Sequence, residues 1–178
     1  MTTDPVSLVD FLLNTPIFAR FEAHEVEVFV PHIEVQDVQA GHIIFEEGSV
    51  GDGWWIVLSG EVSVIKEMPS GPPHVLSLLA RGDTFGEMAL IDGAPRMATL
   101  QAAQDARLGR LSREVFLQLL RAGSMPAVKL LWAMASVLAQ RQRELTLALA
   151  DLAEVAQEDE PRDVEFLSQL FKTQITWN

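Results

Sequence analysis

Two side chains of opposite charge stand nine residues apart in a segment punctuated by glycine and proline. Glu87 follows Gly86, and Arg96 follows Pro95. A guanidinium can bind two phosphate oxygens at once, and a carboxylate accepts hydrogen bonds from sugar hydroxyls. One fixed cation and one fixed anion on the same loop are therefore suited to binding a nucleotide.

The residues between these two charges favour a phosphate-binding geometry. Residues 87–90 can form one helical turn, and the first turn of a helix presents backbone N–H groups and a partial positive charge. Pro95 stiffens the approach to Arg96. The alternative is an ordinary surface connection between two strands in which both charges are incidental, and the spacing leaves both interpretations open.

Three zones and a tail surround this segment. Residues 1–36 carry apolar side chains at helical spacing, which predicts an N-terminal helical segment. Residues 37–111 alternate short apolar runs with glycines, as in an antiparallel β jelly-roll barrel. Residues 112–157 return to helical periodicity, and 158–178 form an acidic tail with a short helix over 163–171. The predicted fold class is α+β, a jelly roll flanked by N-terminal helices and a long C-terminal helix.

The long C-terminal helix, expected from about residue 127 to 157, has a seven-residue apolar repeat over residues 128–156. Leucine occupies one register four times, at 131, 138, 145 and 152. Such a repeat is typical of a coiled-coil seam, so we expect a homodimer through this helix. The alternative is a helix that packs only on its own barrel.

Residues 85–99 resemble the phosphate-binding cassette of cyclic nucleotide-binding domains, which occur in catabolite-activator-type regulators and protein kinase A regulatory subunits. The family pattern is Phe-Gly-Glu, a short apolar helix, Pro-Arg, a variable residue and Ala-Thr. Phe85-Gly86-Glu87, Pro95-Arg96 and Ala98-Thr99 match it. Glycine-marked segments at 40–48 and 56–62 resemble the family's barrel strands, so the resemblance extends over residues 10–157.

The resemblance implies a role for each matched residue. Arg96 would pair with the phosphate, and Glu87 would accept a hydrogen bond from the ribose 2′-OH. Backbone N–H groups of the cassette would surround the phosphate and ribose, two strand residues would line the apolar wall, and two residues of the long helix would lie near the base. The implied ligand-binding residues are Val64, Leu76, Phe85, Gly86, Glu87, Met88, Ala89, Arg96, Met97, Ala98, Thr99, Leu145 and Thr146.

Between cAMP and cGMP we expect cAMP, because Met97 stands where cGMP-preferring relatives often carry a hydroxyl, and methionine offers the guanine amino group no strong acceptor. The hydroxyls of Thr99 and Thr146 keep cGMP open as the alternative ligand. We expect a sensor, not an enzyme, in which ligand binding changes how the C-terminal helix packs on a partner. The competing hypothesis is a scaffold of the same fold that binds no nucleotide and dimerises through its helix. A cupin-type enzyme would need a His/Glu metal cluster, and the sequence offers none.

Composition limits the partners. The formal charge is −12, so nucleic acids and anionic membranes repel the chain at long range. There is no cysteine, and the four histidines stand at no metal-ligand spacing, so we expect no metal or cofactor. No apolar stretch has the length of a membrane span, which favours a cytoplasmic protein. The residues after 157 are too few for a helix-turn-helix domain, so we expect a standalone sensor with an unidentified effector protein.

Overall fold

The computed structural model describes residues 5–159, and side chains from residue 8 to 151. The helices are α1 (Pro5–Leu13), α2 (Ala23–Val26), α3 (Glu87–Asp92), α4 (Arg113–Arg121) and α5 (Met125–Asp159), with short 3₁₀ turns η1 (Pro16–Phe18) and η2 (Val30–His32). The strands are β1 (Ile33–Val38), β2 (Ile43–Phe45), β3 (Gly53–Ser59), β4 (Val62–Lys66), β5 (His74–Leu79), β6 (Thr84–Phe85), β7 (Thr99–Ala102) and β8 (Ala106–Ser112).

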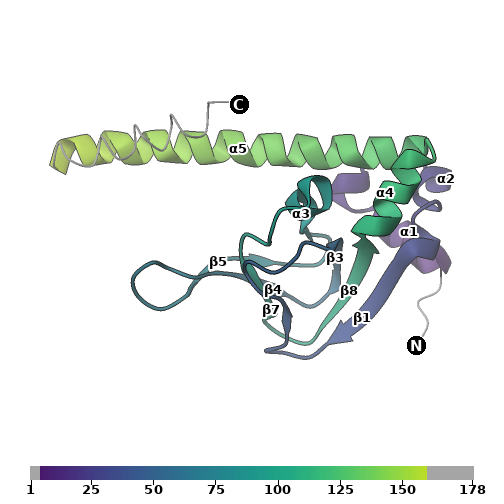
Figure 1. Cartoon of the computed structure of the whole chain (residues 1–178), viewed down its shortest axis with the longest axis horizontal. Coiled ribbons are helices and arrows are strands. Elements are labelled where there is room, and N and C mark those ends of the chain that lie inside the picture. Colours follow the sequence, from purple (N-terminus) through teal and green to yellow (C-terminus); the bar gives the residue numbers. More distant parts are fainter. Residues whose placement is uncertain (1–4, 160–178) are drawn as a thin grey trace. The chain divides into compact units, whose positions relative to one another are not determined.

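The strands form two four-stranded antiparallel sheets, with orders β1-β8-β3-β6 and β2-β7-β4-β5. Two stacked antiparallel sheets with these crossovers form the predicted jelly roll. Figure 1 shows this barrel with α1, α2 and α4 gathered beside β1 and β8. Among the described residues, no helix is long and apolar enough to cross a membrane.

Two hydrophobic cores lie on the two faces of the β1-β8-β3-β6 sheet. The barrel core contains Trp55, Val57, Phe85 and Leu108. The other core packs the N-terminal helices and the start of α5 against the sheet, and it contains Trp54, Ile56, Leu111, Phe18, Phe29, Leu130 and Met134. Because side chains alternate along a strand, adjacent Trp54 and Trp55 serve different cores. Alternation along a strand with one solvent-exposed face would bury only one of these tryptophans, but both faces of β3 are covered and both are buried.

The first strand begins earlier than the sequence predicts. Residues 33–36, which we assigned to the helical zone, belong to β1, since Ile33 pairs with Leu111 and Val35 with Gly109 of β8. The 3₁₀ turn η2 ends at His32, directly before the strand. At the other end of the barrel domain, Ser112 is the N-cap of α4, and its Oγ accepts a hydrogen bond from Val115 N at 3.2 Å.

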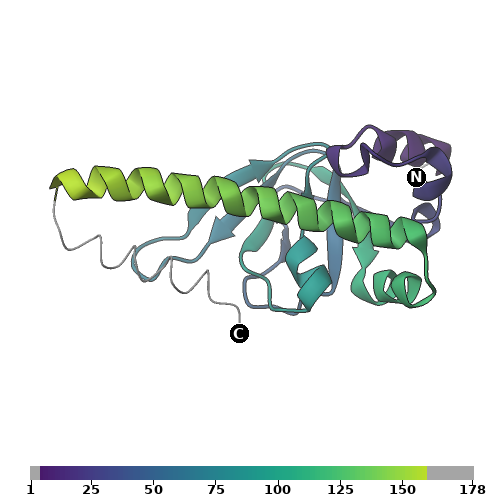
Figure 2. The ribbon, with the colours of Figure 1, turned by 90° about the horizontal axis from the view of Figure 1, so that it is seen from above.

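Helix α5 is 35 residues long and belongs to two compact units, which divide after Met134. In the first unit, Ala127, Leu130 and Met134 are fully buried in the helical core. Figure 2 shows α4 on one side of these first turns and the N-terminal helices on the other. In the second unit, side chains from residue 139 to 151 are exposed apart from the half-buried Leu149. The predicted tail helix at 163–171 lies outside the described residues.

Candidate functional site

The cassette is a short helix bounded by two left-handed glycines. Gly86 precedes α3 with φ 81°, and Gly93 follows it with φ 74°. The predicted helical turn after Gly86 is therefore confirmed, and α3 extends it to Asp92. Positive φ is strained for residues with a Cβ, so glycine permits the abrupt entry from β6 into the helix.

Gly86 is also required by the arginine that lies against it. A Cβ at position 86 would collide with Nη1 of Arg96 and come within 2.9 Å of the Gly53 carbonyl oxygen. The glycine that begins the cassette and the arginine near its end are therefore in direct contact, as a compact loop requires.

The Arg96 side chain points into the protein. The residue is only 4% exposed. Its Nη2 donates to the Gly53 carbonyl at 2.8 Å and to Asp52 Oδ1 at 3.2 Å, and Nη1 donates to the Gly86 carbonyl at 3.4 Å. The guanidinium carbon lies 4.0 Å from the centre of the Phe45 ring. The arginine is therefore fixed in place by carbonyls, one carboxylate and one aromatic face.

The main chain fixes Arg96 as well. Its N–H donates to the Ser49 carbonyl at 2.9 Å, and its carbonyl accepts from Gly48 N at 2.8 Å. These two bonds join the cassette to the loop that follows β2. They fix the Arg96 backbone independently of the contacts that its side chain makes.

The desolvation of the Arg96 guanidinium is only partly offset by its hydrogen bonds and its ion pair. Burial lowers the pKa of Arg96 below its ordinary value, while the charges of Asp52 and, more weakly, Glu87 raise it. Arginine nevertheless remains cationic at any physiological pH. Its Nε is buried and has no hydrogen-bond partner among the described residues. A buried cation with an unused donor is favourable for an additional anion.

Asp52 connects Arg96 to a second arginine that the sequence did not suggest. Asp52 Oδ2 accepts from Arg110 Nη2 at 2.7 Å, while Oδ1 faces Arg96. Asp52, Gly53, Phe45 and Arg110 all contribute to the surroundings of Arg96, yet none was predicted as a site residue. The only sequence feature that pointed to Asp52 is its position between two glycines at the start of a strand.

The predicted cassette residues divide into buried and exposed groups. Glu87 is 5% exposed, and Ala89 is buried where it touches Gly51. Met88 and Met97 are exposed, and Ala98 and Thr99 are half-buried. The Thr99 hydroxyl accepts a hydrogen bond from Glu47 N at 3.0 Å. The ring of Phe85 stacks on Trp55 in the barrel core, with ring centres 6.1 Å apart.

The two predicted wall residues lie on neighbouring strands of the second sheet. Val64 is half-buried, pairs with Leu100 of β7 and packs on the barrel core. Leu76 is 60% exposed on β5, an edge strand whose Val75 and Leu78 are exposed too. The apolar side chains of β5 are therefore available to a ligand or another apolar surface.

Leu145 and Thr146 lie on the part of α5 that belongs to the second unit. Leu145 is 47% exposed, and the Thr146 hydroxyl donates to the Gln142 carbonyl at 2.9 Å. Their role near a nucleotide base stays a prediction.

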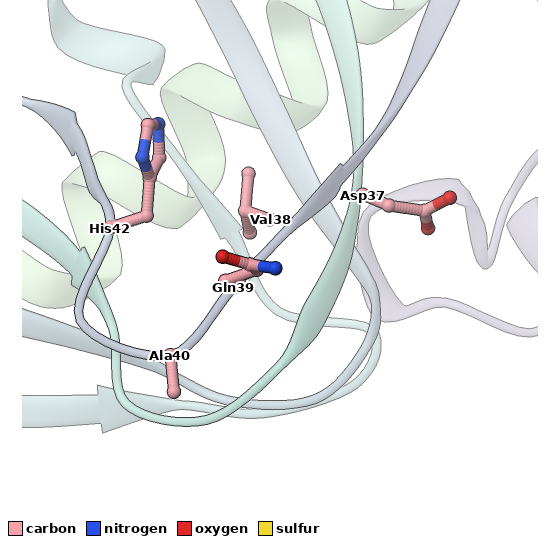
Figure 3. A pocket seen from close by; sticks show the side chains of 5 residues that line it. All are labelled: Asp37, Val38, Gln39, Ala40 and His42. Atoms are coloured by element: carbon pink, nitrogen blue, oxygen red, sulfur yellow. The ribbon is translucent and has the colours of Figure 1, made fainter.

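A cavity of about 410 Å³ lies at the turn between β1 and β2, away from the cassette. Figure 3 shows its lining residues Asp37, Val38, Gln39, Ala40 and His42, with the Asp37 side chain directed away from the others. In the sheet register Val38 pairs with Ala106, whereas Gly53, beside Arg96, pairs with Ser112 at the opposite end of β8. This cavity is therefore not part of the cassette. Among the described residues no three His, Cys, Asp or Glu side chains gather as a metal site would require.

Comparison with known proteins agrees with this architecture. Residues 35–122 match the family model of the cyclic nucleotide-binding domain. The cyclic AMP receptor protein of Thermus thermophilus is 33% identical over 136 residues, which are 76% of this chain and 61% of that protein. The cAMP-dependent protein kinase regulatory subunit of Aspergillus fumigatus is 34% identical over 62% of this chain and 26% of its own length. A cyclic nucleotide-binding domain from Methylobacillus flagellatus superimposes with a TM-score of 0.69, at 28% identity over 79% of each chain.

The chain belongs to the cyclic nucleotide-binding domain family, as the cassette motif predicted. This family consists of binding and regulatory domains, not catalytic ones. The chain spans 61% of its Thermus relative and a quarter of the kinase regulatory subunit, so the activities of those whole proteins do not transfer with the domain. The expectations about nucleic acid, effector and cellular compartment stay predictions.

Proposed function

We propose that this protein binds a cyclic nucleotide in the cassette and that the preferred ligand is cAMP. Arg96 pairs with the phosphate oxygens, and Glu87 accepts a hydrogen bond from the ribose 2′-OH. The observation that carries the proposal is the Arg96 guanidinium, buried inside the family's cassette with its Nε lacking a partner among the described residues. A cyclic phosphodiester supplies the anion that this buried cation favours.

The geometry of Arg96 supports binding of a single negative charge. Its Nη2 is engaged by Gly53 and Asp52, while the contact from Nη1 to Gly86 is long at 3.4 Å. Nε, which has no partner among the described residues, and Nη1, whose one bond is weak, are therefore the donors available to phosphate oxygens. Binding the ligand also offsets the desolvation of the guanidinium.

The preference for cAMP rests on the residue after the arginine. Met97 is 63% exposed and has no strong acceptor for a guanine amino group. Thr99, the nearest hydroxyl along the cassette, already accepts a hydrogen bond from Glu47 N. The Thermus relative is named a cyclic AMP receptor, which supports the same preference.

The proposed output is a change in how α5 packs on a partner. Within the part of the second unit whose side chains are described, Leu145 is 47% exposed and Leu147 is 66% exposed. Ligand binding shifts the population toward the state that binds the ligand better, and the helix passes this shift to a second copy or an effector. The same exposed helix equally suits a scaffold that needs no ligand, which is the second candidate function.

Calorimetric titration separates the two functions. The wild-type protein, verified to be nucleotide-free, should bind cAMP saturably and more tightly than cGMP. Arg96→Lys keeps the charge but loses the two-pronged bond, so its affinity should fall about 10- to 100-fold. Arg107→Lys, a matched substitution on β8 where the arginine pairs with Asp37, should bind as the wild type does. Absence of binding heat with either nucleotide would reject the sensor and leave the scaffold.

A further inference from the structure

The side chain of Arg110 contacts Asp52, which also contacts Arg96. It pairs with Trp55 across β3 and β8 and with Glu34 across β1 and β8, so its side chain lies on the barrel face of the sheet. Its guanidinium carbon lies 5.7 Å from the Trp55 ring centre, and Nη1 donates to Glu34 Oε2 at 3.0 Å. The side chain is only 17% exposed, so an aromatic face and a carboxylate hold it in place.

Asp52 is divided between two guanidiniums. Arg96 takes Oδ1 at 3.2 Å and Arg110 takes Oδ2 at the shorter distance of 2.7 Å. Arg110 Nη2 also reaches the Asp52 carbonyl at 3.3 Å. The Asp52 side chain is 60% exposed, so it is these bonds, and not close packing, that fix the direction of its carboxylate.

This division matters for an anionic ligand. A carboxylate free to rotate could take Arg96 with both oxygens, because arginine and carboxylate favour a two-pronged pair. Such a pair would use the guanidinium edge that a phosphate needs. Asp52 would also repel the phosphate more strongly if no second cation balanced its charge.

We propose that Arg110 is a positioning residue for the phosphate site: by holding one oxygen of Asp52, it leaves Arg96 available to the ligand and balances the carboxylate's charge. This inference rests on the proposed binding of a cyclic nucleotide. Arg110 then affects the affinity for the ligand through Asp52, without touching the ligand itself.

Three substitutions test this role by calorimetry with cAMP. Arg110→Met keeps an apolar side chain over Trp55 and removes both ion pairs, and it should weaken binding about five- to tenfold. Arg110→Lys restores the charge without the two-headed bridge between Glu34 and Asp52, so it should recover part of the affinity. Arg107→Met removes the same charge from the same strand and should change affinity less than twofold, because its partner is the exposed Asp37.

A double-mutant cycle shows whether the effect passes through Asp52. In an Asp52→Asn background, Arg110→Met should lose most of its effect, because there is no carboxylate left to hold. A purely structural role for Arg110 would give the same loss of affinity in both backgrounds. Circular dichroism and thermal unfolding of each variant establish that it is folded, and Arg110→Lys serves if Arg110→Met does not fold.

The outcomes separate this inference from the proposed function. If the wild type binds cAMP but Arg110→Met binds within twofold of it, or loses the same affinity with and without Asp52, Arg110 has no positioning role. If the wild type binds no cyclic nucleotide, the proposed function fails and this inference fails with it. If Arg110→Met lowers cAMP affinity in the wild-type background but has little effect in the Asp52→Asn background, both the proposed function and the positioning role of Arg110 are supported.

Discussion

At the scale of single residues, the site depends on close contact between groups distant in sequence. The Arg96 guanidinium lies against Gly86, ten residues before it, and against Asp52 and Gly53, more than forty residues before it. Each neighbour restricts the guanidinium in a different way, through space, charge or a carbonyl acceptor. The burial that lowers the pKa of Arg96 is therefore the same feature that makes this group a strong anion site.

Gly86→Ala measures how tightly the arginine fits. The substitution adds a Cβ both at φ 81° and against Arg96, so unfolding free energy should fall by about 2–3 kcal/mol and cAMP affinity should fall with it. Gly41→Ala is the matched control, since Gly41 has the same φ and no atom within 4 Å of an added Cβ. It should cost about 1 kcal/mol, from backbone strain alone. Equal losses in urea unfolding would mean that Arg96 moves aside freely.

At the scale of elements, the cassette is held at several points by side chains from other segments. Arg113 of α4 donates from Nε to the Leu90 carbonyl of α3 at 3.1 Å. Lys66, the last residue of β4, donates to the Met97 carbonyl at 2.9 Å and also pairs with Glu47. These contacts tie the first half of the cassette to α4 and the second half to the barrel, so the position of the loop does not depend on α3 alone.

Lys66→Met should change the titration of Glu47. The hydrogen bond from Lys66 is the main cause that lowers the pKa of Glu47 below 4.5, against the opposing effect of desolvation. Such a carboxylate stabilises the folded state above its ordinary pKa, and this contribution disappears as the pH falls through the lowered pKa. In the variant, the pKa of Glu47 should therefore rise, and this part of the acid dependence of stability should vanish. Carboxyl NMR titration with urea unfolding on both sides of pH 4.5 measures both effects.

Lys129→Met provides the control for that titration. Lys129 pairs with Glu25 and lowers the pKa of that carboxyl in the same way, but on the helical side of the molecule. In this variant the pKa of Glu25 should rise while that of Glu47 stays unchanged. A rise in both carboxyl pKa values from either substitution would indicate a general loss of structure instead of a broken pair.

At the scale of the whole molecule, the sequence predicts what is local and periodic. The cassette from Phe85 to Thr99 is contiguous in the sequence, so its helix and the role of its glycines could be predicted. The short glycine-bounded strands predicted the jelly roll. The pairing of Asp52 with Arg96 and Arg110 was not readable, because it depends on which strands become neighbours in the sheets. The burial of both tryptophans was missed for the same reason, since the sequence alone does not show that β3 is covered on both faces.

The long helix gives the prediction that concerns assembly. Leu145 belongs to the predicted seam, whereas Leu147 is exposed but two residues off it, on another face of the helix. If α5 forms a coiled-coil dimer, Leu145→Asp places two buried charges in the interface and should weaken dimerisation about 100-fold or more. Leu147→Asp adds the same charge to a solvated face and should leave the dimer intact. Sedimentation velocity over a range of concentrations distinguishes these results, and a wild type that is monomeric throughout would contradict the coiled coil, leaving the exposed leucines to an effector.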